Sequence, residues 1–177
     1  MAVFALDDLV SQFIACRLPR AEWTHLAHLR VGAWHVHHEG PDTALASLRE
    51  RIRALNEHHG TPNSATSGYH ETITVAYVRL IEEFLRKFAD DTPLAARVDV
   101  LVSGPLAEKD LLLAFWSREV LTSEPARRGW VPPDRAPLRL PPAAPSPGLT
   151  NDPARADRGD RPDGDPADRA TARTIRD

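Results

Sequence analysis

Residues 69–88, YHETITVAYVRLIEEFLRKF, decide the fold class of this chain. Apolar side chains recur along the stretch at Val75, Val78, Ile81, Leu85 and Phe88. Their spacing of three or four residues places them on one face of an α-helix. Asp90, Asp91 and Pro93 follow the stretch and are typical of a helix stop. The sequence therefore predicts a long helix from about Tyr69 to Phe88 that buries one side against the rest of the protein.

Three helices are predicted before this stretch. Apolar residues at helical spacing from Leu6 to Phe13 predict the first helix, which must end before Pro19. The second is expected from near Ala21 to Gly40, because a glycine followed by a proline ends a helix. Asp42 is expected to cap the third helix, which ends at about Gly60.

The rest of the body is predicted to contain a loop and shorter helices. Residues 60–68, GTPNSATSG, are small, hydroxylated or turn-forming, which indicates an irregular loop. Two short helices are expected at 93–102 and 106–116, and residues 117–134 are expected to form a helical turn and an extended strap. No pair of strands with a hairpin turn is indicated. The sequence thus predicts an all-α, single-domain helical bundle of about five to six helices.

Length and composition limit the domain and exclude some partners. The chain has 177 residues, and a helical-bundle domain is predicted at 1–135. Residues 136–177 contain eight of the 16 prolines and few large apolar side chains, so we predict that they form a disordered tail. The net charge of -3, without a run of Lys or Arg, indicates that nucleic acid is not a partner.

Neither a membrane span nor a secretion signal is predicted. No apolar run approaches the roughly 20 residues that a transmembrane helix needs. Asp7 and Asp8 interrupt the apolar stretch near the N-terminus, which has no basic leader. The lone Cys16 cannot form an internal disulfide. We therefore expect a cytoplasmic protein without a membrane partner, and the sequence predicts no oligomeric state.

Histidines supply the candidate functional site. His25 and His28 lie three residues apart in the second predicted helix, so their side chains share a face. His70 opens the fourth helix, which can pack against the second. We therefore predict that His25, His28 and His70 bind a divalent metal such as zinc or iron, with catalytic His70 followed by Glu71 as a fourth ligand or general base. The expected activity is metal-assisted hydrolysis or oxidation of a small polar or anionic molecule.

Two other interpretations of these residues stay open. In the first, the protein is a metal-free enzyme in which His70 and Glu71 transfer protons while His25 and His28 bind an anionic group. In the second, it is a small-molecule binding or regulatory module in which the histidines are structural. The small-molecule ligand is common to all three interpretations.

Polar residues near the predicted loop are candidates for contacts with that ligand. Ser67 or Thr66 is expected to cap the fourth helix by accepting a bond from its first turn. Because the N-terminus of a helix presents unpaired N–H groups, the alternative is that the loop at 60–68 also helps to hold a carboxylate or a phosphate next to His70. Asn63 and Thr74 are expected to position the substrate. Arg127 and Arg128 could reach a carboxylate bidentately across the site, but a surface ion pair is the expected role of each.

Four motifs resemble those of a family of uncharacterised bacterial proteins. They are W-T-H-x-A-H-L at 23–29, N-x-x-x-G-x-x-N at 56–63, G-Y-H-E-T-x-T at 68–74 and W-V-x-P-D at 130–134. The resemblance spans roughly Phe4 to Asp134 and implies functional positions rather than a reaction: Trp23, Thr24, His25, His28, Asn56, Asn63, Gly68, Tyr69, His70, Glu71, Thr74 and Trp130. Among these we assign Asn56, Asn63, Tyr69 and Thr74 to substrate binding. His35 stands where the family usually has an aromatic residue, so we leave it out of the site.

Overall fold

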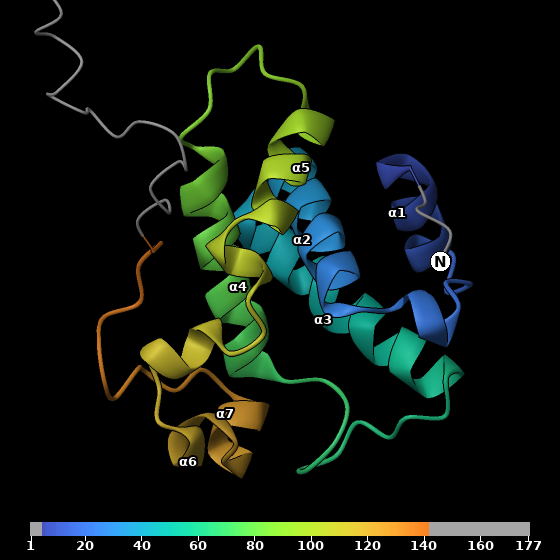
Figure 1. Ribbon diagram of the computed structural model, residues 1–177. Coiled ribbons are helices and arrows are strands. Elements are labelled where there is room, and N and C mark those ends of the chain that lie inside the picture. Colours follow the sequence, from blue (N-terminus) through green and yellow to red (C-terminus); the bar gives the residue numbers. More distant parts are fainter. Residues whose placement is uncertain (1–4, 142–177) are drawn as a thin grey trace, which may run out of the picture. The chain divides into compact units, whose positions relative to one another are not determined.

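The computed structural model describes residues 5–141. This part of the chain is helical and contains no strand, which confirms the predicted all-α class (Figure 1). Its α-helices are α1 (Leu6–Ile14), α2 (His25–Glu39), α3 (Pro41–His58), α4 (Glu71–Leu85), α5 (Leu94–Ser103), α6 (Arg118–Leu121) and α7 (Glu124–Arg128). Three short 3₁₀ helices lie between them: η1 (Arg20–Glu22), η2 (Pro105–Ala107) and η3 (Leu111–Ala114). The longer helices form a bundle, as the sequence predicts.

Helix α2 lies at the centre of the bundle. It packs against α1, α3, α4 and α5 (Figure 1). Leu29 and Val31 are both buried although they lie two residues apart and therefore point to nearly opposite sides of the helix, as expected for a helix with neighbours around it. His35 is also fully buried, with its ring edge-on to that of Phe13. His35 is thus a residue of the core.

The buried face of α4 is the one that the sequence predicts. Its members include Val75, Val78, Ile81 and Leu85. The helix is nevertheless shorter than predicted. It ends at Leu85, so Phe88 lies beyond its last turn. At the other end the first helical residue is Glu71, since the ring of His70 accepts the N–H of Ile73 (3.4 Å) and caps the first turn.

Helices α2 and α3 begin at other residues than those predicted. Residues 20–22 form η1, and α2 begins after Thr24, whose Oγ1 accepts the N–H of Ala27 at 3.2 Å. Helix α3 begins at Pro41, because proline suits the first helical position. Asp42 is therefore not the cap, and it lies in the first turn, where a negative charge stabilises the helix.

The segment after α5 departs furthest from the prediction. Residues 106–116, predicted as one helix, are divided between η2 and η3. Trp116, at the end of this segment, is fully buried. Its indole N–H donates to the carbonyl of Val131 (3.1 Å), which ties the chain after α7 to the core.

Residues 131–141 form a strap that reaches α4. The N–H of Leu140 donates to a carboxylate oxygen of Glu83 (3.0 Å), and Leu138 and Leu140 pack against the core. The sequence predicts that the disordered tail begins at residue 136. Residues 136–141 belong to the strap instead. The predicted disorder of the remaining residues, 142–177, lies outside the described part of the chain. Among residues 5–141, no helix combines the length and the apolar composition that crossing a membrane requires.

Candidate functional site

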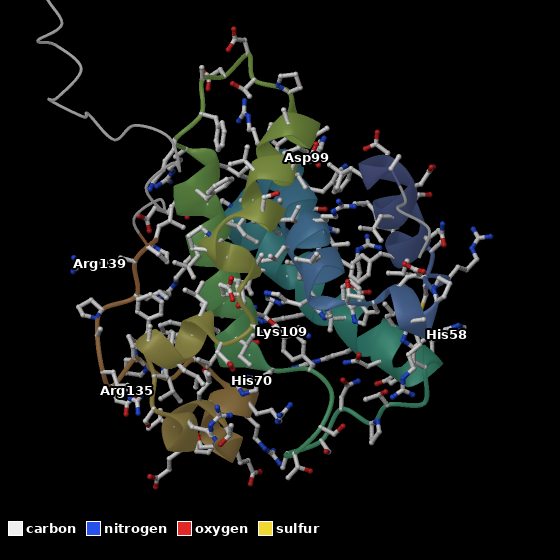
Figure 2. All side chains as sticks on the ribbon, in the orientation of Figure 1. His58, His70, Asp99, Lys109, Arg135 and Arg139 are labelled. Atoms are coloured by element: carbon white, nitrogen blue, oxygen red, sulfur yellow. The ribbon has the colours of Figure 1, made fainter. Side chains whose placement is uncertain are left out.

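The structure does not assemble the predicted three-histidine metal centre. Among residues 5–141, no group of three or more His, Cys, Asp or Glu side chains is arranged to hold a metal ion. His25 and His28 lie in the first turns of α2. His70 lies at the start of α4, beside α6 and α7 (Figure 2). The three rings are hydrogen bonded to backbone carbonyls in three separate segments, those of Leu106, Thr24 and Leu121 respectively.

His70 connects the start of α4 to α6. Its Nε2–H donates to the carbonyl of Leu121 at 2.9 Å, and its Nδ1 accepts the N–H of Ile73 at 3.4 Å. Both contacts require the neutral ring with the proton on Nε2. Burial lowers the pKa of His70, which favours this neutral form. Because both ring nitrogens are occupied, His70 could bind a metal or transfer a proton only after losing one of these bonds.

Glu71 is held in an ion pair with Arg49 of α3. Arg49 donates through Nε to both carboxylate oxygens, at 3.0 and 2.9 Å, and through Nη2 to Oε1. The hydroxyl of Tyr69 donates to Oε2 at 2.8 Å. Burial tends to raise the pKa of Glu71, but the hydrogen bonds from Arg49 and Tyr69 outweigh it, and the pKa falls below its usual value. A charged carboxylate saturated with donors is poorly suited to be a general base or a metal ligand, the two roles predicted for it.

Asn63 holds the loop between α3 and α4 in place. Its Oδ1 accepts hydrogen bonds from Nδ2 of Asn56 (3.1 Å) and from the backbone N–H of Tyr69 (3.0 Å). Its Nδ2 donates to the carbonyl of Arg53 (3.0 Å). A Cβ atom at Gly68 would lie 2.6 Å from Oδ1 of Asn63, so only glycine fits there, with its φ of +74°. Asn56 and Asn63, predicted to bind substrate, are brought together, and they contact each other.

Thr72 and Thr74 of α4 have backbone partners. Thr74 donates to the carbonyl of His70 at 2.9 Å. Thr72, which the sequence analysis did not select, is buried, donates to the carbonyl of Gly129 (2.7 Å) and accepts the N–H of Val131 (3.0 Å). The signal in the sequence that could have selected Thr72 is its place within the G-Y-H-E-T-x-T motif. The motif therefore joins the start of α4 to the chain after α7.

His28 has one free ring nitrogen. Its Nδ1–H donates to the carbonyl of Thr24 at 2.7 Å, so Nε2 carries no proton in the neutral ring. The ring stacks on that of Trp23, with centroids 3.7 Å apart and planes at 27°. Within residues 5–141, Nε2 of His28 makes no hydrogen bond. In His25, by contrast, Nε2 lies 3.2 Å from the carbonyl oxygen of Leu106.

A cavity of about 60 Å³ lies beside His28, between α2, α3 and α4. Apolar side chains form most of its wall, among them Leu48, Ile52, Ile73, Val78 and Ile81. The His28 side chain is exposed to solvent, although its ring stacks on Trp23 and borders this cavity. Partial desolvation by the neighbouring groups lowers the pKa of His28, and the hydrogen bond to Thr24 opposes the change. The imidazole is therefore neutral at physiological pH.

A larger hollow, of about 530 Å³, lies where the loop meets α3 and α7. It is termed the arginine hollow here and is lined by Arg53, Glu57, Asn63, Ser64, Ala65, Tyr69, Arg127 and Arg128. Two of the four residues predicted to bind substrate, Asn63 and Tyr69, belong to it. The other two lie elsewhere, since Thr74 lines the cavity beside His28 and Asn56 lines neither space.

The arginines of the hollow differ in their partners. Arg53 lies over the ring of Tyr69, 4.6 Å from its centroid. Arg127 donates through Nη1 to the carbonyls of Gly68 (3.1 Å) and Tyr69 (3.2 Å), while its Nε is buried without a hydrogen-bond partner in the described part of the chain. Arg128 forms an ion pair with Glu124 at 2.7 Å. The predicted surface ion pair is thus confirmed for Arg128 and wrong for Arg127.

Arg49 and Arg53 are site residues that the sequence analysis missed. They lie four residues apart in α3, and this spacing places their side chains on one face of the helix. The signal was therefore present in the sequence.

An apolar groove of about 530 Å³ lies between α4, α5 and the strap. Phe84, Val100 and Leu140 border it, and its wall offers few polar groups. It ends at Pro141, the last described residue, so we assign no ligand to it.

Comparisons with protein families, curated proteins and solved structures give no match for this chain. The resemblance to a bacterial family stays a prediction. Two spaces are left as candidate sites on geometric grounds, the arginine hollow and the cavity beside His28.

Proposed function

We propose that this chain binds a small anionic molecule in the arginine hollow. The observation that carries the proposal is the pair of Arg53 and Arg127, which line the same hollow and have no carboxylate partner among residues 5–141. Two guanidinium groups near each other repel, and an anion between them replaces this repulsion with attraction. The proposal corresponds to the binding-module interpretation of the sequence.

The charge balance of the hollow favours an anion. Three arginines line it, and Glu57 is the single carboxylate among the described lining residues. Glu57 accepts a hydrogen bond from Asn63 (3.2 Å). Arg128 already has Glu124 as its partner, so Arg53 and Arg127 face one carboxylate, Glu57, and the hollow keeps an excess of one positive charge.

The hydrogen-bonding groups of the hollow favour the same class of ligand. A buried N–H without an acceptor costs about 1–3 kcal/mol, and an anionic oxygen would satisfy the Nε of Arg127. Guanidinium groups bind carboxylates and phosphates through paired N–H donors. The volume of the hollow, about 530 Å³, also lies within the roughly 300–1,000 Å³ of small-molecule sites.

Binding is favoured over catalysis because the described lining residues of the hollow include no histidine, and their one carboxylate, Glu57, already accepts a hydrogen bond from Asn63. Burial raises the pKa of Tyr69, so its hydroxyl is neutral, and it donates to Glu71. The metal-dependent and the acid–base interpretations both need a free group on His70 or Glu71, and both residues are engaged with other parts of the fold.

Isothermal titration calorimetry at low ionic strength tests the proposal, with inorganic phosphate, sulfate and citrate as probes. We expect saturable binding of at least one probe, weakened about 10- to 100-fold in Arg53→Gln, because a charge-assisted hydrogen bond contributes about 1.5–3 kcal/mol. Arg118→Gln is the matched control, since Arg118 is exposed, lies outside the hollow and carries the same charge. Absence of binding, or equal affinities for the wild type and Arg53→Gln, would contradict the proposal.

A further inference from the structure

We infer that the anion bound in the arginine hollow also carries an ammonium group, so that the ligand has two negative charges and one positive charge, as an acidic α-amino acid does. The inference rests on the proposed function and names the class of its ligand. It starts from the charges of the hollow, which have both signs. Two arginines and one carboxylate line it, and among residues 5–141 they form no ion pair with one another.

Glu57 supplies the negative charge of the hollow. Its Oε1 accepts the amide N–H of Asn63 at 3.2 Å, whereas its Oε2 accepts no hydrogen bond from residues 5–141. Because Asn63 is held by the carbonyl of Arg53 (3.0 Å), its contact with Glu57 ties the carboxylate to the loop. An ammonium group has three donors and a positive charge, so it is well suited to the oxygen that is left.

Arg53 supplies a positive charge close to Glu57. The two residues lie one turn apart on α3, a spacing at which they could form an ion pair. The described residues contain no such pair, since Arg53 lies over the ring of Tyr69, 4.6 Å from its centroid, and Glu57 contacts Asn63. Each of the two charges can therefore contact the opposite charge of a ligand without first breaking an ion pair.

Arg127 supplies the second positive charge, from α7. Its Nη1 donates to the carbonyls of Gly68 and Tyr69, and its Nε is buried without an acceptor among residues 5–141. The two bonds hold the guanidinium group against the loop, so little side-chain entropy is lost when an anion binds to it. The negative part of the ligand thus has guanidinium partners on two helices, α3 and α7.

The charges of the hollow select the charges of the ligand. Arg53, Arg127 and Glu57 together leave one positive charge, because Arg128 is paired with Glu124. A dianion without an ammonium group would be repelled by Glu57, and a neutral zwitterion would leave one arginine without a counter-charge.

Two kinds of small molecule have the required pattern. They are acidic amino acids, with two carboxylates, and phosphate esters of amino alcohols, whose phosphate carries about −1.5 to −2 at pH 7.

Calorimetric titration of the whole protein at low ionic strength compares ligands with and without the ammonium group. The pairs are L-glutamate with glutarate, and O-phosphoethanolamine with ethyl phosphate. We expect the ammonium-bearing member of at least one pair to bind at least about threefold more tightly, because Glu57 attracts the ammonium group and repels the dianion. In Glu57→Gln this preference should be lost, although the amide oxygen can still accept from Asn63.

Glu50→Gln is the matched control. Glu50 is an exposed carboxylate of α3 outside the hollow, so this variant should keep the preference of the wild type. A preference confined to the first pair would assign the site to amino acids, and one confined to the second pair would assign it to phosphate esters.

Three results would overturn the inference. The first is equal or weaker binding of both ammonium-bearing ligands by the wild type, the second is a preference that persists in Glu57→Gln, and the third is an equal loss of preference in Glu50→Gln. The proposed function survives all three if inorganic phosphate, sulfate or citrate still binds in a manner that depends on Arg53, and it fails if no anion binds. If Glu57→Gln does not fold, the comparison of ligand pairs in the wild type decides the outcome.

Discussion

Replacing Glu71 with glutamine tests whether this residue is structural rather than catalytic. The change keeps the size of the side chain but removes the charge that Arg49 contacts through Nε at 3.0 and 2.9 Å. It also turns one acceptor oxygen into an amide group, so that either Arg49 or the hydroxyl of Tyr69 loses its partner. A residue that serves a reaction alone would show no such loss of stability.

The expected loss follows from the exposure of the two partners. A hydrogen bond to a charged group contributes about 1.5–3 kcal/mol when it is buried. The Glu71 side chain is only 8% exposed, but that of Arg49 is 41% exposed, so water screens the pair and solvates Arg49 in the variant. We therefore expect Glu71→Gln to lower the free energy of unfolding by about 2 kcal/mol, below the roughly 3–5 kcal/mol lost when a fully buried ion pair is broken.

Urea unfolding at pH 7, followed by circular dichroism, measures this loss. Glu82→Gln is the matched control, because its ion pair with Arg86 is exposed at 25% and 75% and should contribute less than about 0.5 kcal/mol. The pKa of Glu71 is lowered, so its contribution is present above the unfolded value of 4.5 and is lost as the pH falls below it. The difference between wild type and Glu71→Gln should therefore shrink at pH 3. A Glu71→Gln protein as stable as the wild type at pH 7, or more stable, would refute the structural role.

Two further predictions concern the histidines. His70→Ala removes the cap of α4 and the hydrogen bond to Leu121, and it should lower the free energy of unfolding by about 2 kcal/mol. His70→Asn keeps an acceptor for the cap and should lower it by about half as much. Equal losses of the two variants in urea unfolding would count against the capping role. The pKa values of His35 and His70 are both lowered by burial, so the unfolded chain binds more protons below its usual histidine value of 6.5. The stability they confer is complete above pH 6.5 and decreases as the pH falls below it, so the midpoint of thermal unfolding should decrease between pH 7.5 and 5. A constant midpoint would show that these rings are not held neutral.

The sequence predicts the fold class because the fold class depends on local periodicity. The apolar spacing of Val75, Val78, Ile81 and Leu85 is a property of one segment, and the structure buries all four side chains. Helix ends are predicted less well because they depend on caps. The ring of His70 ends the N-terminal side of α4, and histidine is not among the usual cap residues.

The candidate site could be predicted only in part, because a side chain's partners are often distant in sequence. The i,i+3 spacing of His25 and His28 correctly places both in the first turns of α2, but it does not reveal that their rings bind different carbonyls. His70 is 51 residues from Leu121, and Arg127 is 59 residues from Gly68. No local pattern specifies such pairs. The signal that was available is the spacing of Arg49 and Arg53, one turn apart on α3; Arg49 pairs with Glu71, and Arg53 lines the arginine hollow.

The contacts of α6 and α7 imply that two distant segments open together. Leu121 accepts from His70, Gly129 accepts from Thr72, and Arg127 donates to the carbonyls at the end of the loop. These bonds are the attachments of the loop and of the first turn of α4, so residues 60–72 and 117–131 should exchange their amide hydrogens as one cooperative unit. An anion that contacts Arg127 would slow this exchange in both segments at once. A bound anion would therefore also make the loop more resistant to proteolysis.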